Sequence, residues 1–153
     1  MIVASFFIPL ELPTFNELEA ARGKVAAARG TGDSTRQNAY NALKRKAQHD
    51  CAVHFLSQRG RNSILPRLPW PLAGGPFVVE LNWRTRDART DPDNIAAGKK
   101  ILLDALSVTR ADSVGAGVLH CDGHHCIAGF RDSFVTGADP ASRGVQIFIE
   151  NGD

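Results

Sequence analysis

One short segment with alternating apolar and polar side chains constrains the fold of this chain more than any other feature. Residues 77–83 read FVVELNW, with apolar side chains at every odd position from Phe77 to Trp83, and with Glu80 and Asn82 at even positions. Successive side chains of a β-strand point to opposite faces, so this pattern predicts a strand with one buried face. We therefore expect a sheet that packs one side against a hydrophobic core.

Three helices are expected from capping signals and periodicity. Thr14 followed by Glu17 has the spacing of a capping box and predicts a helix over about residues 15–29, which the Gly-Thr-Gly of residues 30–32 ends. Asp33 or Ser34 can cap a second helix that runs to about residue 59, and a third is expected over residues 94–108. The second helix has an apolar stripe that predicts one buried side: Tyr40, Leu43, Ala47, Cys51 and Phe55.

The order of all expected elements indicates the fold class. Further strands are expected at residues 2–8, 126–135 and 144–150, and residues 57–76 form an irregular loop rich in proline and glycine. The resulting order, strand-helix-helix-strand-helix-strand-strand, predicts an α/β (α+β) fold in which helices pack on one small mixed sheet. A length of 153 residues suits a single domain that spans residues 1–153.

Composition narrows the class of protein and its compartment. The apolar fraction of 43% is typical of a globular chain, and no run approaches the roughly 20 apolar residues that cross a bilayer. The apolar opening lacks a basic stretch and a cleavage site, so a first strand explains it better than a signal peptide. The odd cysteine count of 3 argues against a disulfide framework, so we expect a cytoplasmic protein.

Basic residues gather in clusters although the net charge is only +2. The clusters can follow a phosphate backbone, but a solvated helix face or loop explains any one of them equally well. Their members are Lys44, Arg45 and Lys46 in the second helix; Arg59, Arg61 and Arg67 in the loop; and Arg84, Arg86 and Arg89 after the central strand.

The segment after the central strand has the highest density of chemically active side chains. Asp91 and Asp93 flank Pro92 between a strand end and a helix start, and either Asp93 or Asn94 can cap that helix. One interpretation is that both acids are only turn and capping residues beside a favourable helix dipole. The other is that two carboxylates, two residues apart in an extended segment, bind one Mg²⁺ ion together with phosphate oxygens and water.

Two further features favour the metal-site interpretation. Helical periodicity places Lys100 and Asp104 on the same face as Asp93, about two and three turns further along, where a lysine can reach a phosphate oxygen. An i,i+4 ion pair between Lys100 and Asp104 is the simpler explanation of that spacing. Another acid, Asp122, begins the next expected strand.

These residues together resemble a known family. RDARTDPDNIAAGKKILLDAL followed by GAGVLHCDGHHCIAGFRDSF, over about residues 84–134, is similar to the core of the RusA family of Holliday-junction endonucleases, which are frequent in prophages. The family pattern is D-x-D-N at a helix start, a lysine within that helix, Asp-Ala-Leu at its end, and an acid at the next strand start. The opening IPLELPTFNE is similar more weakly.

The resemblance implies roles for individual residues. It makes Asp91, Asp93 and Asp122 the metal-binding carboxylates and Lys100 the catalytic lysine, with Asn94 and Asp104 in support. Lys99 is turned 100° from Lys100 on a helix and is a candidate for DNA contact, as are Arg84, Arg86 and Arg89. Two departures exist: the lysine stands three residues further along than in the shortest family members, and Cys121 replaces an acid that many relatives have before Asp122.

A cluster of histidines and cysteines suggests zinc by composition but not by spacing. His120, Cys121, His124, His125 and Cys126 lie too close together for the paired knuckles of structural zinc sites. We expect Cys121 and Cys126 to be buried strand residues and His124 and His125 to belong to a turn; either histidine can contact phosphate or water.

The function implied by the resemblance is a Mg²⁺-dependent, or Mn²⁺-dependent, endodeoxyribonuclease that resolves Holliday junctions by paired symmetric nicks. Its partners are branched DNA and a second copy of the chain, because a two-fold symmetric junction needs two symmetry-related cuts. The expected setting is the bacterial host cytoplasm, with a phage or prophage gene. The alternatives are a DNA-binding module without activity and a zinc-stabilised interaction module.

Overall fold

The computed structural model describes residues 1–29, 33–59, 69–110 and 114–152, apart from the side chains of residues 24–37. Residues 30–32, where the sequence predicts the end of the first helix, lie outside this description. The same is true of Arg61 and Arg67 in the basic part of the loop.

Four strands form one mixed sheet in the order β1-β4-β2-β3. β4 (Gly144–Asn151) lies antiparallel between β1 (Ile2–Ile8) and β2 (Phe77–Arg84), and β3 (Ile127–Val135) is parallel to β2. The predicted α+β class and the predicted strands are therefore confirmed, including the alternating burial of residues 77–84.

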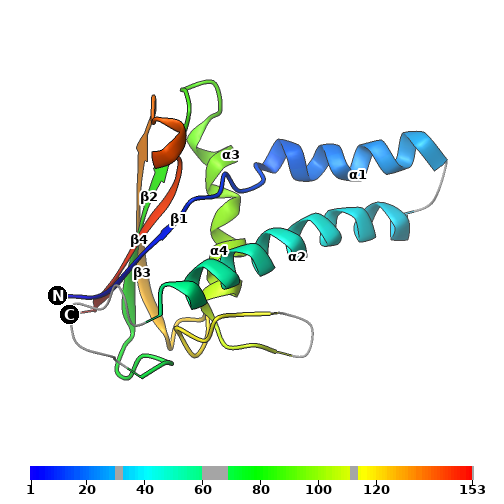
Figure 1. The fold of residues 1–153 in the computed structure, drawn as a ribbon. Coiled ribbons are helices and arrows are strands. Elements are labelled where there is room, and N and C mark those ends of the chain that lie inside the picture. Colours follow the sequence, from blue (N-terminus) through cyan, green and yellow to red (C-terminus); the bar gives the residue numbers. More distant parts are fainter. Residues whose placement is uncertain (30–32, 60–68, 111–113, 153) are drawn as a thin grey trace.

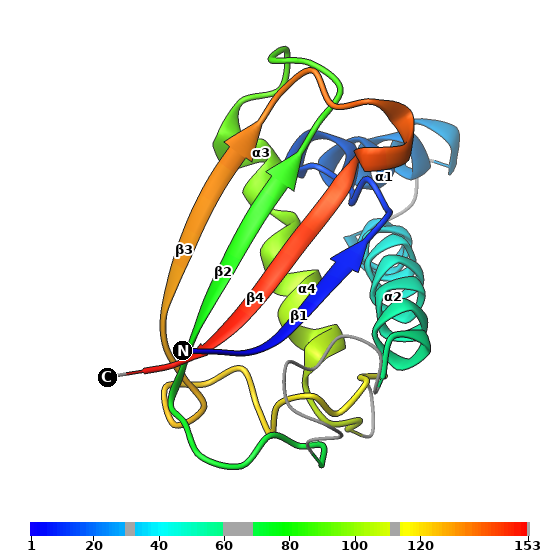
Figure 2. The same cartoon turned by 60° about the vertical axis from the view of Figure 1, so that its left-hand side comes forward.

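The helices lie on one side of this sheet (Figures 1 and 2). They are α1 (Phe15–Arg29), α2 (Asp33–Ser57), α3 (Pro92–Ala96) and α4 (Gly98–Leu106), and a short 3₁₀ turn covers Pro140–Ser142. α4 packs across the sheet, α2 packs against α4, and the hairpin of α1 and α2 extends away from the sheet (Figure 1). Among the described residues, no helix combines the length and apolar character that crossing a bilayer requires.

The predicted helix signals hold where the side chains are described. The capping box at the start of α1 is formed, since the Thr14 amide donates to Glu17 at 2.8 Å and the Glu17 amide donates to the Thr14 hydroxyl at 3.2 Å. In α2 the predicted stripe faces inward, with Cys51 and Phe55 fully buried. Trp70 packs edge-on against Phe6, so it holds the end of the long loop to the core.

The two edges of the sheet differ. At β1 the Gln58 side chain accepts from the Phe7 amide at 3.0 Å and donates to the Phe7 carbonyl at 2.7 Å, as a neighbouring strand would. Among the described residues, β3 has a neighbouring strand on one side only. Large apolar side chains on this edge strand are partly exposed, with Phe130 at 41% and Phe134 at 36%.

The predicted third helix is wrong in its start and in its continuity. It begins at Pro92 with Asp91 as N-cap residue, rather than with Asp93 or Asn94, because the fixed φ of proline suits the first helical position. It is also interrupted at Ala97, so that α3 and α4 are separate. The interruption precedes Gly98, a residue of low helix propensity, whose Cα packs closely against Leu12 and Trp83.

Candidate functional site

The predicted site residues fall at opposite ends of one pair of parallel strands. Asp91 and Asp93 follow the carboxyl end of β2, whereas Asp122 precedes the amino end of β3. Figures 1 and 2 show α3 at one end of the sheet and the segment before β3 at the other. The structure therefore does not gather the three predicted carboxylates into one cluster.

Asp91 and Asp93 are both exposed at the start of α3. The Asp91 backbone is extended, with φ −62° and ψ 147°, and its carboxylate makes no capping hydrogen bond. Within the described part of the chain, neither carboxylate has an ion pair or a side-chain hydrogen bond. Asn94 follows in the same turn. The pair is thus available to a ligand outside the chain.

Lys100 connects α4 to the loop before β3. Its ammonium pairs with Asp104 at 2.8 Å, the i,i+4 pair expected from the spacing, and also with Asp122. Ser107, Val108 and Arg110 complete a small pocket of about 170 Å³ around this group. Lys100 is therefore held by two carboxylates that are separate from the pair at the start of α3.

Both partners of the Lys100–Asp122 pair have shifted pKa values. The hydrogen bond from Lys100 lowers the pKa of Asp122 by more than partial burial raises it, and Arg110 adds to the lowering. Partial burial lowers the pKa of Lys100, but its hydrogen bonds to Asp104 and Asp122 outweigh this effect and leave the pKa above its usual value. Both groups are thus charged over the whole neutral range.

Lys99 has a different partner, as expected from its position 100° around the helix from Lys100. Its ammonium pairs with Asp132 of β3 and lies 5.0 Å from the centre of the Phe130 ring. The other Asp132 oxygen accepts a hydrogen bond of 3.0 Å from the buried Trp83 indole. The sequence analysis did not single out Asp132, because only the pairing of β2 with β3 brings it to Trp83 and Lys99.

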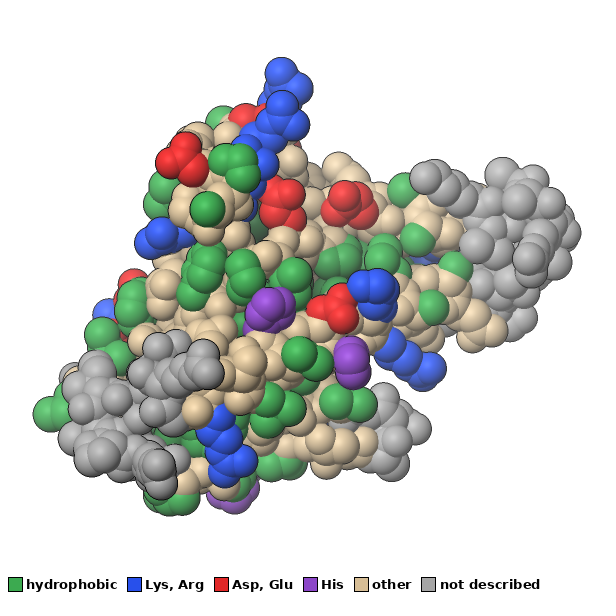
Figure 3. Space-filling view, viewed as in Figure 1, with side chains coloured by type: hydrophobic (Ala, Val, Ile, Leu, Met, Phe, Trp, Pro, Cys, Tyr) green, Lys and Arg blue, Asp and Glu red, His purple; other side chains and the backbone are tan. Residues whose placement is uncertain are grey.

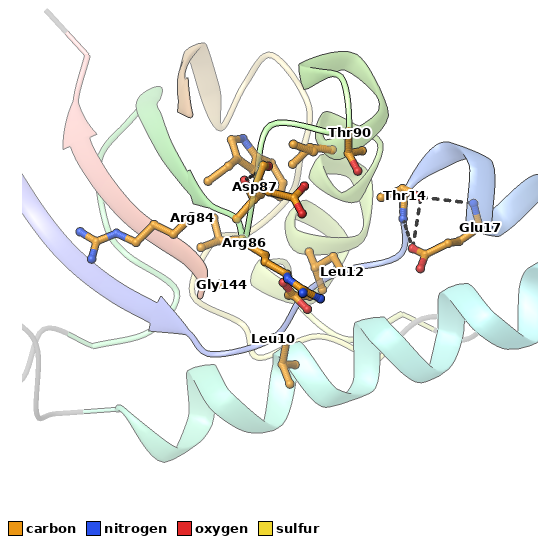
Figure 4. Close-up of a pocket in the computed structure, with 14 residues that line it drawn as sticks. Leu10, Leu12, Thr14, Glu17, Arg84, Arg86, Asp87, Thr90 and Gly144 are labelled. Carbon is orange, nitrogen blue, oxygen red and sulfur yellow. Dashed lines mark hydrogen bonds between the residues drawn. The ribbon is translucent and has the colours of Figure 1, made fainter. Parts of the chain in front are cut away.

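The side chains of the arginines predicted to contact DNA point in different directions. Figure 4 shows that the Arg84 side chain points away from Arg86, and the Arg84 Nε donates to Asn82 at 3.1 Å. Arg89 lies 3.8 Å from the Asp87 carboxylate. On the face seen in Figure 3, Lys and Arg side chains gather at the end of the molecule that bears the loop after β2, with acidic side chains beside them.

A pocket of about 270 Å³ lies at the same end of the sheet as Asp91 and Asp93 (Figure 4). The connection from β1 to α1, the loop after β2, the start of β4 and Ile95 of α3 form its walls. Thr90, which lines the pocket, directly precedes Asp91. The pocket and the exposed pair of carboxylates are therefore adjacent.

The expectation for the cysteine pair is wrong. Cys121 and Cys126 are half-buried residues outside β3 and form a disulfide, with their Cα atoms 5.8 Å apart. A turn stabilised by hydrogen bonds of 2.9 Å from the Cys126 and Ile127 amides to the Gly123 carbonyl brings them together. His124 and His125 lie in this turn and are exposed, as is His120. With both thiols bonded, this cluster offers no thiolate to zinc.

No three His, Cys, Asp or Glu side chains in the described ranges lie close enough together to hold a metal ion. The two exposed carboxylates at the start of α3 fit a Mg²⁺ ion that takes its other ligands from phosphate and water. Asp122, at the far end of the strand pair and bound to Lys100, does not fit as a third ligand of that ion.

Comparisons with known proteins identify no family for this chain, so its class is defined by its fold and its candidate site alone. No family model matches the chain, and neither a curated protein nor a solved structure matches it significantly. The class that is shown is a mixed α+β fold with helices on one face of a four-stranded sheet. Its candidate site is an exposed carboxylate pair beside a pocket at the carboxyl end of β2.

Proposed function

We propose that the chain is a Mg²⁺-dependent endonuclease that cuts branched DNA, with the four-way Holliday junction as its substrate. The observation that supports this most is the state of Asp91 and Asp93. Both carboxylates are exposed and bind nothing else in the described chain, although they stand at a helix start where a capping role would engage them. A pair used only for capping would hydrogen-bond to the backbone amides of α3.

The surroundings of the pair agree with a phosphodiester substrate. Arg86 and Arg89 lie in the loop that leads to it, and their positive charge favours a polyanionic substrate. A Mg²⁺ ion held by two carboxylates would polarise a phosphoryl oxygen and lower the pKa of a bound water. Asp91 and Asp93 are the residues that would hold this ion, and Mn²⁺ would be accepted in its place.

The roles of Lys100 and Asp122 differ from those that the family resemblance implies. Because Lys100 is held by Asp104 and Asp122, we propose that this group forms a second contact with the junction rather than a part of the metal site. A second copy of the chain would supply the matching cut on the opposite strand. The bacterial cytoplasm, with a phage or prophage origin, is the setting that suits this activity.

Cleavage of a synthetic four-way junction in Mg²⁺ tests the proposal. The wild-type chain should nick two strands of like polarity, and Asp93→Asn should lower the cleavage rate by at least about a hundredfold. Binding in the absence of divalent ions should be unchanged or tighter for this variant, since the substitution removes a charge that repels phosphate. Sedimentation of the free protein at micromolar concentration tests the expected dimer.

Asp139→Asn is the matched control, because Asp139 is an exposed acid in the β3–β4 connection whose side chain caps nothing. It should cut at the wild-type rate. Cleavage by Asp93→Asn at the wild-type rate would overturn the metal site. Junction binding by the wild-type chain without cleavage under any divalent ion would favour the DNA-binding module instead.

A further inference from the structure

The pocket beside the carboxylate pair has an apolar floor. Trp83 and Val145 form its base and are almost fully buried, at 2% and 1% exposure. Half-buried Leu10, Leu12 and Ile95 extend this surface. Its volume of about 270 Å³ lies below the roughly 300 Å³ at which pockets for drug-sized ligands begin. The pocket therefore has room for one planar ring system.

Two charged side chains at the pocket have no partner within the described part of the chain. Neither Arg86 nor Glu11 forms an ion pair or a side-chain hydrogen bond there. Figure 4 shows Arg86 extending from the end of β2 toward Leu12. By contrast, Thr14 and Glu17 at the same pocket are engaged with each other in the capping box. A donor fork and an acceptor are thus left for a ligand.

We propose that this pocket receives one unstacked nucleobase of the branched DNA, and that the base is guanine. Arg86 would donate to O6 and N7 of guanine, the pairing that arginine makes most often with a base. Glu11 would accept from the N1–H and N2–H groups on the Watson–Crick edge of the base. The apolar floor would contact one face of the base, as sites for flipped bases do.

The position of the pocket gives this contact a consequence for cutting. Thr90 joins the pocket to Asp91, so a base in the pocket holds a neighbouring phosphate at the carboxylate pair. The nick then falls at a fixed distance from a guanine. This inference rests on the proposed function. Recognition of junction shape alone would give no base preference, and the pocket would add one.

Binding and cleavage test it separately. Four immobile junctions that carry one unpaired nucleotide at the branch point and differ only in its base are titrated without divalent ions, so that nothing is cut. The guanine junction should bind about tenfold to a hundredfold more tightly than the others. Cleavage of a junction with a mobile branch point is then mapped by sequencing, and guanine should be enriched at one fixed position relative to the nick.

Atomic substitutions in the base identify the two side chains. Replacing guanine by 7-deazaguanine, which lacks the N7 acceptor, should weaken binding of the wild-type chain and have little further effect on Arg86→Met. Replacing guanine by hypoxanthine, which lacks the N2 amino group, should behave in the same way with Glu11→Gln. Arg89→Met is the matched control: Arg89 lies in the same loop but is not among the described residues that line the pocket, so the variant should lower affinity for all four junctions alike.

The outcomes distinguish this inference from the proposed function. Cleavage with no base preference in binding or in cut position overturns the guanine pocket and leaves the endonuclease standing. A guanine preference that disappears in Arg86→Met, without any cleavage by the wild-type chain, confirms the pocket and overturns the endonuclease. If the guanine preference remains in both Arg86→Met and Glu11→Gln, the pocket is not the source of that preference and the inference is overturned.

Discussion

Lys100 of α4 and Asp122 of the loop before β3, 22 residues apart, form an ion pair that joins the crossover helix to the start of its strand. Asp104 shares the same ammonium. The pair fixes one end of the β2–α3–α4–β3 unit, whereas Asp91 and Asp93 occupy the other end without partners in the described chain. The two halves of the acidic motif are thus held apart: Asp91 and Asp93 follow the carboxyl end of β2, and Asp122 precedes the amino end of β3.

Replacing Lys100 by methionine should lower stability by a pH-dependent amount. The pair lowers the pKa of Asp122, so its contribution is complete above the unfolded pKa of about 3.9 and is lost as pH falls through the lower folded value. The raised pKa of Lys100 makes the contribution complete below about pH 10.4 and lost as pH rises beyond the folded value. The Lys100 side chain is 57% exposed, so we expect the substitution to lower the free energy of unfolding by at most about 1 kcal/mol.

Urea unfolding of wild-type and Lys100→Met at about pH 7 and about pH 2 measures this difference in the free energy of unfolding, which should be larger at the first pH than at the second. Lys44→Met is the control, because its ammonium lies near the Tyr40 ring and not near a carboxylate. A Lys100→Met effect of equal size at both pH values would contradict the assigned pair.

Reduction of the Cys121–Cys126 disulfide should destabilise the fold. Closing a loop with a sequence separation of 5 removes chain entropy from the unfolded state worth about 2 kcal/mol. A Tm that is lower by about 4–8 °C in a dithiol reductant is expected, and Cys121→Ser should show the low value without reductant. An unchanged Tm would show that the bond does not constrain the loop.

Cys51 provides an internal control for that experiment. It is fully buried, and burial raises the pKa of its thiol to about 12, so it should not react with a thiol reagent in the folded chain. Titration should find no reactive thiol in the native oxidised chain, one after denaturation, and three after reduction and denaturation. A reactive thiol in the native oxidised chain would contradict the burial of Cys51 or the disulfide.

Asp132→Leu should lower the free energy of unfolding more than Asp132→Asn does. Leucine leaves the buried Trp83 indole N–H without its acceptor, which costs about 1–3 kcal/mol, whereas the asparagine carbonyl can still accept. Chemical unfolding followed by circular dichroism measures both variants. Equal losses of unfolding free energy in the two variants would indicate that the ion pair with Lys99, and not the hydrogen bond from Trp83, accounts for the contribution of Asp132.

Gly144→Ala should strongly destabilise the chain. Gly144 has a φ of +137°, and a Cβ there would lie 2.0 Å from the Ile8 carbonyl oxygen, so the start of β4 would have to move. We expect a loss above about 2 kcal/mol, measured as a fall in Tm. Gly129→Ala is the control, since a Cβ at Gly129 meets nothing within 4 Å.

The sequence predicted those parts of the fold that depend on local patterns. The alternation in residues 77–83, the capping box at Thr14 and the stripe of α2 each correspond to an element in the structure. The start of α3 was misplaced because the preference of Pro92 for the first helical position outweighed the capping potential of the residues after it.

The arrangement of the site could not be predicted from spacing alone. The distance between Asp93 and Asp122 depends on β2 and β3 being parallel neighbours, which no local pattern reveals. The same pairing brings Asp132 to Lys99 and Trp83. The disulfide depends on a turn whose geometry brings Cys121 and Cys126 together. In each case the missing information was a contact between segments that are distant in sequence or joined by an irregular turn.

The side chain of Gln58 occupies backbone groups of Phe7 that a further strand would otherwise use. A sheet with one free edge can join another such sheet only once, and the result is a closed pair. A sheet with two free edges can add copies without limit. By occupying the groups of Phe7, the Gln58 amide makes the β1 edge a poorer template for a further strand than the β3 edge, which favours a pair of copies over a fibre.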